Sequence, residues 1–202
     1  MRMLETRAVL LSKADPAIAA PQLALAMGPL GFVAPAASIP AGYPVRPHEV
    51  LRFAWQRAGG GWVIVPSDLS LLFKVGLKLS ALLPGETLLA VQRAMDGAVT
   101  LKTYRDGRPG FKLGEDEDLE LAYRVMSANP EDLRALLAAE GLRDRDAVEA
   151  QIAAVARLGP GALPGLLAAL GVVLILPSLP EVLQNPNAPV LELVDERSPL
   201  AP

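Results

Sequence analysis

Two Asp-Gly pairs constrain the fold of this 202-residue chain more than any other feature of its sequence. Asp-Gly between two β-compatible runs is typical of a hairpin, because glycine accepts the positive φ angles that a tight hairpin turn needs. Here Asp96-Gly97 and Asp106-Gly107 separate three such runs, and a fourth run follows after an acidic stretch. We therefore predict an antiparallel meander. Its expected strands are Thr87 to Met95, Ala98 to Arg105, Phe111 to Leu113 and Leu119 to Met126.

The residues before the meander predict strands alternating with helices. Asp15-Pro16 is a strong helix start, because aspartate caps the free N–H groups and proline suits the first helical position. That helix should end at Gly28-Pro29, and a proline-rich connection from Gly31 to Pro47 should follow without much regular structure. The other expected elements are strands Arg7 to Ser12, Glu49 to Arg57 and Trp62 to Val65, and a helix from Leu69 to Leu83.

After Met126 the pattern becomes helical. Asn129-Pro130 starts a helix with acidic residues in its first turn. Glycines at 141 and 171 stop helices, and apolar runs near the C-terminal end suit short strands. We expect helices at 131–140, 144–158 and 161–170, a strand at 172–176, a helical turn from Leu179 to Gln184 and a strand from Val190 to Val194.

These elements predict an α+β fold. Residues 1–126 should form a mainly antiparallel sheet, a meander in part, with packed helices. Residues 127–202 should form a helical subdomain with one or two added strands. The two regions should pack together, because the connection near residue 128 is short.

Composition excludes several classes of function. The chain has no cysteine, which rules out thiolate catalysis, disulfide scaffolds and cysteine-ligated zinc or iron–sulfur sites. Its net charge is −3, so nothing supplies the basic footprint of a nucleic-acid-binding protein, and we expect no nucleic acid as a partner. Absence of cysteine also suits the reducing cytoplasm, which we expect as the location.

Two long stretches carry no charge. Residues 16–45 and 158–180 are long enough to span a bilayer, but proline and glycine interrupt both of them. We therefore expect no membrane partner. The first stretch leaves one alternative open, a membrane-associated or secreted protein that uses residues 16–45.

The sequence contains no motif for catalysis, for a cofactor or for a metal. The one histidine, His48, has no G-x-S-x-G nucleophile motif to serve. Gly59-Gly60-Gly61 lacks the lysine and the spacing of a phosphate loop. The acidic run Glu115 to Asp118 lacks the ligand spacing of an EF-hand. We therefore predict no catalytic residue, no metal ligand and no cofactor.

Four residues are candidates for binding. Trp55 and Trp62 flank the glycine turn and could face each other across a hairpin, either as a core anchor or as a recognition platform. Tyr104 and Arg105 precede the second Asp-Gly turn, and both residue types are enriched at interface hot spots.

The expected function is therefore a non-enzymatic, cytoplasmic protein-binding module, such as an adaptor, a regulator or a toxin-neutralising protein of the immunity type. Its partner is expected to be another protein. An enzyme that works with carboxylates such as Asp68, without cysteine or histidine, is the main alternative. The run Leu79 to Val91, followed by Thr103 to Gly107, resembles small uncharacterised bacterial proteins, and this resemblance implies no function.

Overall fold

The computed structural model describes residues 6–39, 44, 46, 48–58, 61–93, 99–113 and 176–202. These residues form one eight-stranded antiparallel sheet with three α-helices, so the predicted α+β class is confirmed. The strands are β1 (Arg7–Ser12), β2 (Phe32–Val33), β3 (Val50–Ala58), β4 (Gly61–Pro66), β5 (Thr87–Arg93), β6 (Val99–Arg105), β7 (Arg108–Leu113) and β8 (Val190–Asp195). The helices are α1 (Pro16–Met27), α2 (Leu72–Leu82) and α7 (Leu179–Leu183), with 3-10 turns at Gly28–Leu30 and Leu69–Leu71.

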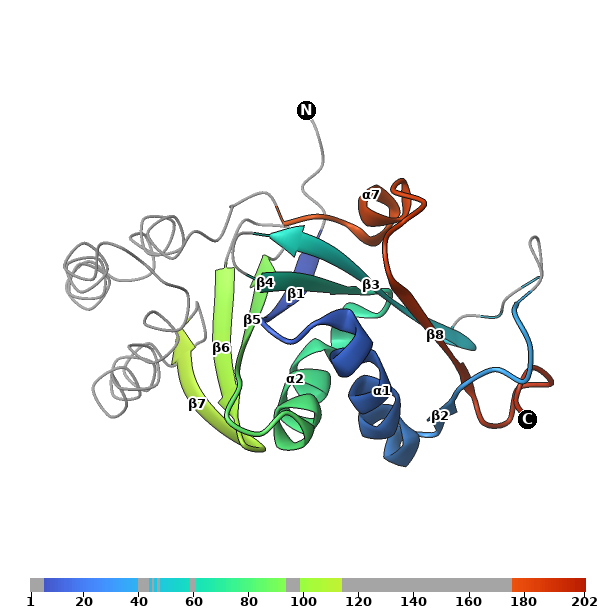
Figure 1. The fold of residues 1–202 in the computed structure, drawn as a ribbon, viewed down its shortest axis with the longest axis horizontal. Coiled ribbons are helices and arrows are strands. Elements are labelled where there is room, and N and C mark those ends of the chain that lie inside the picture. The colour runs from blue at the N-terminus through green and yellow to red at the C-terminus, as the bar shows by residue number, and fades with distance from the viewer. Residues whose placement is uncertain are drawn as a thin grey trace.

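The sheet has the order β2-β8-β3-β4-β1-β5-β6-β7 (Figure 1). The predicted meander is confirmed for β5, β6 and β7, although β7 begins at Arg108 rather than at Phe111. The expected fourth strand at 119–126 and the expected elements at 131–176 lie outside the described residues, except for Leu176, which is not part of a strand. The expected strand at 190–194 is confirmed as β8, and it pairs with β3 along Val50–Ala54.

The proline-rich connection contains one strand that the sequence did not predict. Phe32 and Val33 form β2, which pairs with Asp195 and Val194 of β8 at the edge of the sheet. Only two residues pair, so local pattern gives little signal. The division predicted at residue 126 stays a prediction, but a strand from beyond it lies inside the sheet formed by residues before it.

Helices α1 and α2 cover one face of the sheet, and α7 lies on the other face (Figure 1). Alternate residues of each strand point to the helical face. On β3 these are Leu51, Phe53 and Trp55, which join the main core with residues of α1 and α2. On the opposite face Ala54 is fully buried and Val182 of α7 is 3% exposed. The middle of the sheet is therefore buried on both faces.

Helix α2 approaches the sheet closely because Gly76 has no side chain. A Cβ atom at this position would lie 2.8 Å from two ring carbons of Tyr104 on β6. Real Cβ contacts do not come this close, and the ring is itself 4% exposed within the core. Any side chain at residue 76 would push helix and strand apart.

Candidate functional site

Strand β3 extends further than its neighbour β8 at one end. Their pairing runs from Val50 to Ala54, and one further hydrogen bond joins the Trp55 N–H to the Pro189 carbonyl at 2.9 Å. In an antiparallel ladder this bond should be returned by the opposite N–H, but proline has none. The Trp55 carbonyl is therefore left without its ladder partner. We call residues 55–58 the bare end of β3.

Arg57 extends this bare end. Strand residues alternate in the side to which their backbone groups point, so the N–H and carbonyl of Arg57 face the same side as those of Trp55. Among the described residues nothing hydrogen-bonds these two groups of Arg57. On its other side the strand stays paired with β4, through Gln56 with Val63 and Arg57 with Trp62.

The chain that precedes β8 turns away from β3 in a compact loop. Asn185 organises this loop, since its carbonyl accepts the Ala188 N–H at 3.0 Å and its side chain accepts the Asn187 N–H at 3.0 Å. Asx turns of this kind are common at chain reversals. The loop and the bare end of β3 consequently face each other across open space.

Two hollows flank the bare end. The apolar hollow, of about 390 Å³, lies on the helical face, and its lining residues are Asp15, Pro16, Ala17, Ala20, Trp55, Trp62, Pro189 and Val190. The polar hollow, of about 380 Å³, reaches around the edge toward α7, and its lining residues are Trp55, Gln56, Arg57, Trp62, Glu181, Val182, Asn185, Asn187, Ala188 and Pro189. We call the two hollows together with the bare end the edge groove.

The two predicted tryptophans both line the edge groove, but they do not face each other directly. Trp55 stands opposite Ile64, and Trp62 stands opposite Arg57, so the two rings are diagonal neighbours on the helical face. Trp55 is 1% exposed, and its indole Nε1 has no hydrogen-bond partner among the residues that the structure describes. Trp62 is partly buried, and the Arg57 guanidinium lies over its ring at 5.0 Å.

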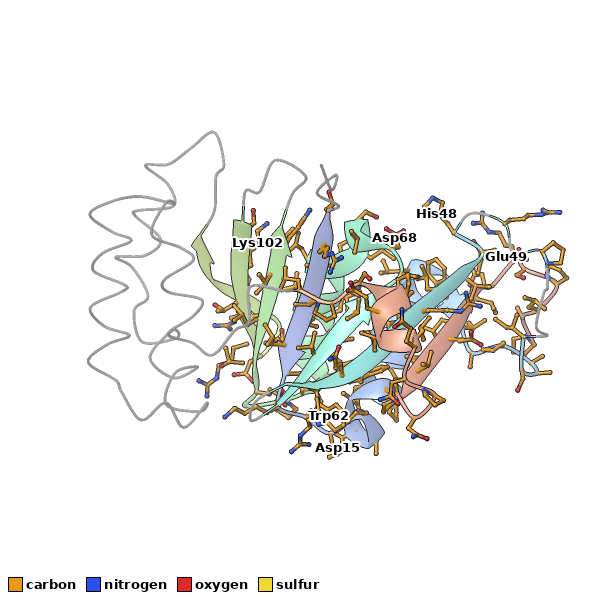
Figure 2. All side chains as sticks on the ribbon, turned by 90° about the horizontal axis from the view of Figure 1, so that it is seen from above. Asp15, His48, Glu49, Trp62, Asp68 and Lys102 are labelled. Atoms are coloured by element: carbon orange, nitrogen blue, oxygen red, sulfur yellow. The ribbon has the colours of Figure 1, made fainter. Side chains whose placement is uncertain are left out.

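The start of α1 forms the wall of the apolar hollow. Asp15 caps the helix by accepting the Ala17 N–H at 2.9 Å, as its sequence predicts. The turn before it is held by Glu86, whose carboxylate accepts the Ser12 hydroxyl and the N–H groups of Lys13 and Ala14. Asp15 and Trp62 lie close together at one end of the sheet in Figure 2.

Charge is distributed unequally in the groove. On the α7 side Glu181 already holds Arg7, with contacts of 2.9 and 3.2 Å, and it accepts the Ser178 N–H. The Ser178 hydrogen bonds and the bonds from Arg7 lower the pKa of Glu181. On the helical side the Asp15 side chain makes no ion pair with any described residue. The apolar hollow therefore has the Asp15 carboxylate at its wall, and the Arg57 guanidinium lies over the neighbouring Trp62 ring.

A second polar cluster lies at the other end of β3, away from Trp62 (Figure 2). The His48 Nδ1 lies 3.2 Å from Asp68 Oδ2, and the Ser70 hydroxyl donates to Asp68 Oδ1 at 2.6 Å. In a nucleophilic triad the histidine lies between serine and aspartate, but here the aspartate lies between the other two. The cluster therefore has no base placed to activate the serine.

The state of Asp68 also argues against acid–base chemistry. Partial burial raises the pKa of Asp68, but hydrogen bonds from the Ser70 hydroxyl and N–H and from His48 outweigh it, and the pKa is lowered. A general acid or base works best with a pKa near the working pH, which is the opposite direction. His48 itself is 77% exposed.

Tyr104 and Arg105, the other two predicted binding residues, lie apart from the edge groove. Both are on β6, and β1 and β5 separate that strand from β4 in the sheet. Tyr104 is in the core, where burial raises its pKa to about 12. The Arg105 Nε lies 3.6 Å from the Oδ2 of its neighbour Asp106. A binding role for this pair stays a prediction.

The described ranges contain neither a cluster of metal ligands nor a membrane-spanning helix. Within them, no three histidine, aspartate or glutamate side chains gather as metal ligands would. No helix in that part of the chain has both the length and the apolar character needed to cross a bilayer. The acidic run 115–118 lies outside the described residues.

Sequence reasoning identified the tryptophans but missed the rest of the groove. Asp15 appeared only as a helix cap, and Pro189 and Asn185 carried no signal, because β8 brings them to β3 from about 130 residues away. Comparisons with family models, with curated proteins and with solved structures find no match for this chain.

Proposed function

We propose that this protein is a non-enzymatic binding module, an adaptor, regulator or toxin-neutralising protein, that recognises another protein through the edge groove. The observation that carries the proposal is the bare end of β3, which lies between two hollows and is lined by both tryptophans of the chain. Unpaired strand backbone attracts another chain, and natural proteins usually cover or interrupt it.

The residues of the groove support this proposal. Tryptophan and arginine are enriched among the residues that contribute most to binding at protein interfaces. Trp62 presents a partly buried ring with Arg57 above it, and both line the polar hollow. The ring is held by the sheet on one side, so little conformational entropy is lost when a partner covers it.

The proposal includes a cytoplasmic location. Its support is the lack of cysteine, which suits a reducing compartment. Cell fractionation with N-terminal sequencing of the recovered chain tests it. Recovery in the soluble cytoplasmic fraction is expected, and a chain in the membrane fraction or cleaved within residues 16–45 would contradict this location.

Site-specific photo-crosslinking tests the binding surface. A photoreactive amino acid at Gln56, which is exposed and lines the polar hollow, should give a discrete cross-linked product with another protein in living cells. The same amino acid at Lys74, exposed on α2, is the matched control and should give no such product.

A second variant connects the product to the tryptophans. Trp62→Ala combined with the photoreactive residue at position 56 should lose most of the cross-linked product. Equal products at positions 56 and 74, or a product unaffected by Trp62→Ala, would mean that the edge groove is not the binding surface.

A further inference from the structure

We infer that the ligand of the edge groove is an extended, basic polypeptide segment that adds to the bare end of β3 as a short strand. The inference rests on the proposed function and specifies the ligand. Its first support is the backbone itself. The N–H and carbonyl of Arg57 point to the side of β3 that β8 leaves open, without partners among the described residues, whereas Pro189 occupies the place opposite Trp55. An extended segment offers the matching donors and acceptors at the same spacing.

The position of the two hollows is the second support. Successive side chains of a strand point to opposite faces of a sheet. A segment beside Gln56 and Arg57 therefore directs one side chain toward the apolar hollow and the next toward the α7 side. The three residues 56–58 span about 10 Å, enough for about three residues of ligand.

The charged and polar groups that line the edge groove favour some ligand segments over others. The apolar hollow presents Pro16, Ala20 and Trp62, with the Asp15 carboxylate at its wall. The aliphatic stem of lysine or arginine can lie along such a surface while its charged end reaches a carboxylate. We therefore assign a lysine or arginine to the position that faces this hollow. On the other side Gln56, Asn185 and Asn187 suit a side chain that forms hydrogen bonds.

The same carboxylate argues against an anionic ligand. The start of a helix usually attracts phosphate or carboxylate groups through its free N–H groups. At α1 the Asp15 side chain already accepts one of these N–H groups and adds a negative charge of its own. A nucleotide or an acidic peptide would meet repulsion at this wall.

The test begins with the intact protein and a phage-displayed library of random linear heptapeptides. Panning should enrich peptides with lysine or arginine two residues from an apolar or second basic residue, and a synthetic copy of the best binder is then measured by titration calorimetry. Trp62→Ala should weaken its binding at least tenfold. Enrichment of acidic peptides, or binding that Trp62→Ala leaves unchanged, would overturn the inference.

N-methylation of the synthetic peptide separates strand addition from other binding. Methyl groups placed one residue at a time remove single backbone donors without changing the protein. Affinity should fall at least tenfold at alternate positions and stay within twofold at the positions between them. On the protein, the Arg57 amide should exchange its hydrogen more slowly in the complex. Uniform tolerance of N-methylation would overturn strand addition.

Asp15→Asn tests the charge preference without removing the helix cap, because asparagine caps as well as aspartate does. The variant should bind the peptide three- to tenfold more weakly and lose most of the salt dependence of binding. Unchanged affinity would overturn the basic preference. If no peptide binds while the cross-link from position 56 persists, the inference fails and the proposed function stands; if the cross-link also fails, both fail.

Discussion

The two ends of β3 are held in different ways. At its start, side chains and backbone groups from three segments hold the strand. The Glu49 carbonyl accepts the Asp195 N–H, and the Glu49 carboxylate accepts the Ser198 hydroxyl at 2.7 Å and the Arg46 N–H at 2.9 Å. At its end, the last bond on the β8 side is the one from Trp55 to Pro189.

Under the proposed function, this difference assigns the first half of β3 to stability and its exposed end to recognition. The start of β3 uses its hydrogen-bonding groups within the protein, whereas the end leaves some of them toward open space. Arg52, in the first half of β3, also has its groups bonded within the protein. Its N–H donates to the Ser67 hydroxyl, its carbonyl accepts the Ser67 N–H, and its Nε donates to the Glu192 carboxylate at 2.7 Å. Substitutions in the first half should therefore affect folding, and substitutions of the exposed Gln56 and Arg57 should affect binding.

The largest effect on stability is expected from Phe53→Ala. Phe53 is 1% exposed and stands between Leu191 and Pro66 in the sheet. Its truncation should lower the free energy of unfolding by about 3–5 kcal/mol, because it leaves a cavity in the core. Chemical denaturation measures this value. Leu25→Ala, at a position 64% exposed, is the control and should change it by less than about 0.5 kcal/mol. If Arg57→Gln costs as much as Phe53→Ala, the two halves of β3 do not differ as we describe.

Glu49→Gln should destabilise the protein in a pH-dependent way. The Arg46 N–H and the Ser198 hydroxyl lower the pKa of Glu49 below its ordinary value of 4.5. A lowered pKa means that the carboxylate stabilises the folded state above pH 4.5, and that this contribution is lost as the pH falls through the folded-state pKa. The variant should be less stable than the wild type at pH 7, and the difference should shrink below pH 4.5.

Denaturation at several pH values checks the Glu49 prediction. Glu196→Gln is the matched control, because Glu196 is exposed on the turn that follows β8, near the Ser198 that bonds Glu49. A constant difference between wild type and Glu49→Gln from pH 7 to pH 3 would contradict the assigned hydrogen bonds.

Pro189→Ala sharpens the comparison by adding the missing donor. Alanine has an N–H that can bond the Trp55 carbonyl and extend the ladder by one bond. The gain of a hydrogen bond is offset by the greater freedom of the unfolded chain without proline, so stability should change by less than about 1 kcal/mol. Hydrogen exchange should show a protected amide at residue 189. A rapidly exchanging amide there would mean that the loop, and not proline, keeps β8 from continuing.

The smallest effect is expected from Arg57→Gln. The change removes the cation that lies 5.0 Å from the centre of the Trp62 ring. Cation–π contacts at exposed sites contribute about 0.5–1 kcal/mol, so the loss of stability should not exceed this. Tryptophan fluorescence should change as the ring loses its cover. Arg108→Gln, an exposed arginine on β7, should change neither quantity.

Local signals explain why much of the fold could be predicted. Asp15-Pro16 and Gly28 mark the ends of α1, and Asp106-Gly107 marks the turn between β6 and β7. Each depends on a few adjacent residues. The order of the strands depends on pairings between distant residues, such as Phe32 with Asp195, which no local pattern encodes. The strand predicted at 111–113 is shorter than β7, because Pro109 lies within β7 and proline is tolerated in a strand only at an edge or at a bulge.

In the candidate site, too, the features with a local sequence signal could be predicted and those that depend on distant residues could not. Trp55 and Trp62 stood out as large aromatic residues beside a turn. The register between the two tryptophans could not be predicted, because the turn geometry sets the register of a hairpin and three consecutive glycines allow several turn geometries. Pro189 lacks the N–H that would bond the Trp55 carbonyl. This effect could not be predicted, because it depends on which strand Pro189 lies beside.

The place of β8 in the sheet also matters for how this protein is made. A ribosome synthesises residues 50–58 about 130 residues before it reaches residues 190–195, which fill the gap between β2 and β3. Until then, the whole length of β3 has the open edge that the finished protein keeps only at one end. Contacts between residues so far apart form slowly, and exposed edges invite aggregation. Slow translation or a chaperone during this interval should therefore affect the yield of folded protein more than substitutions on its surface do.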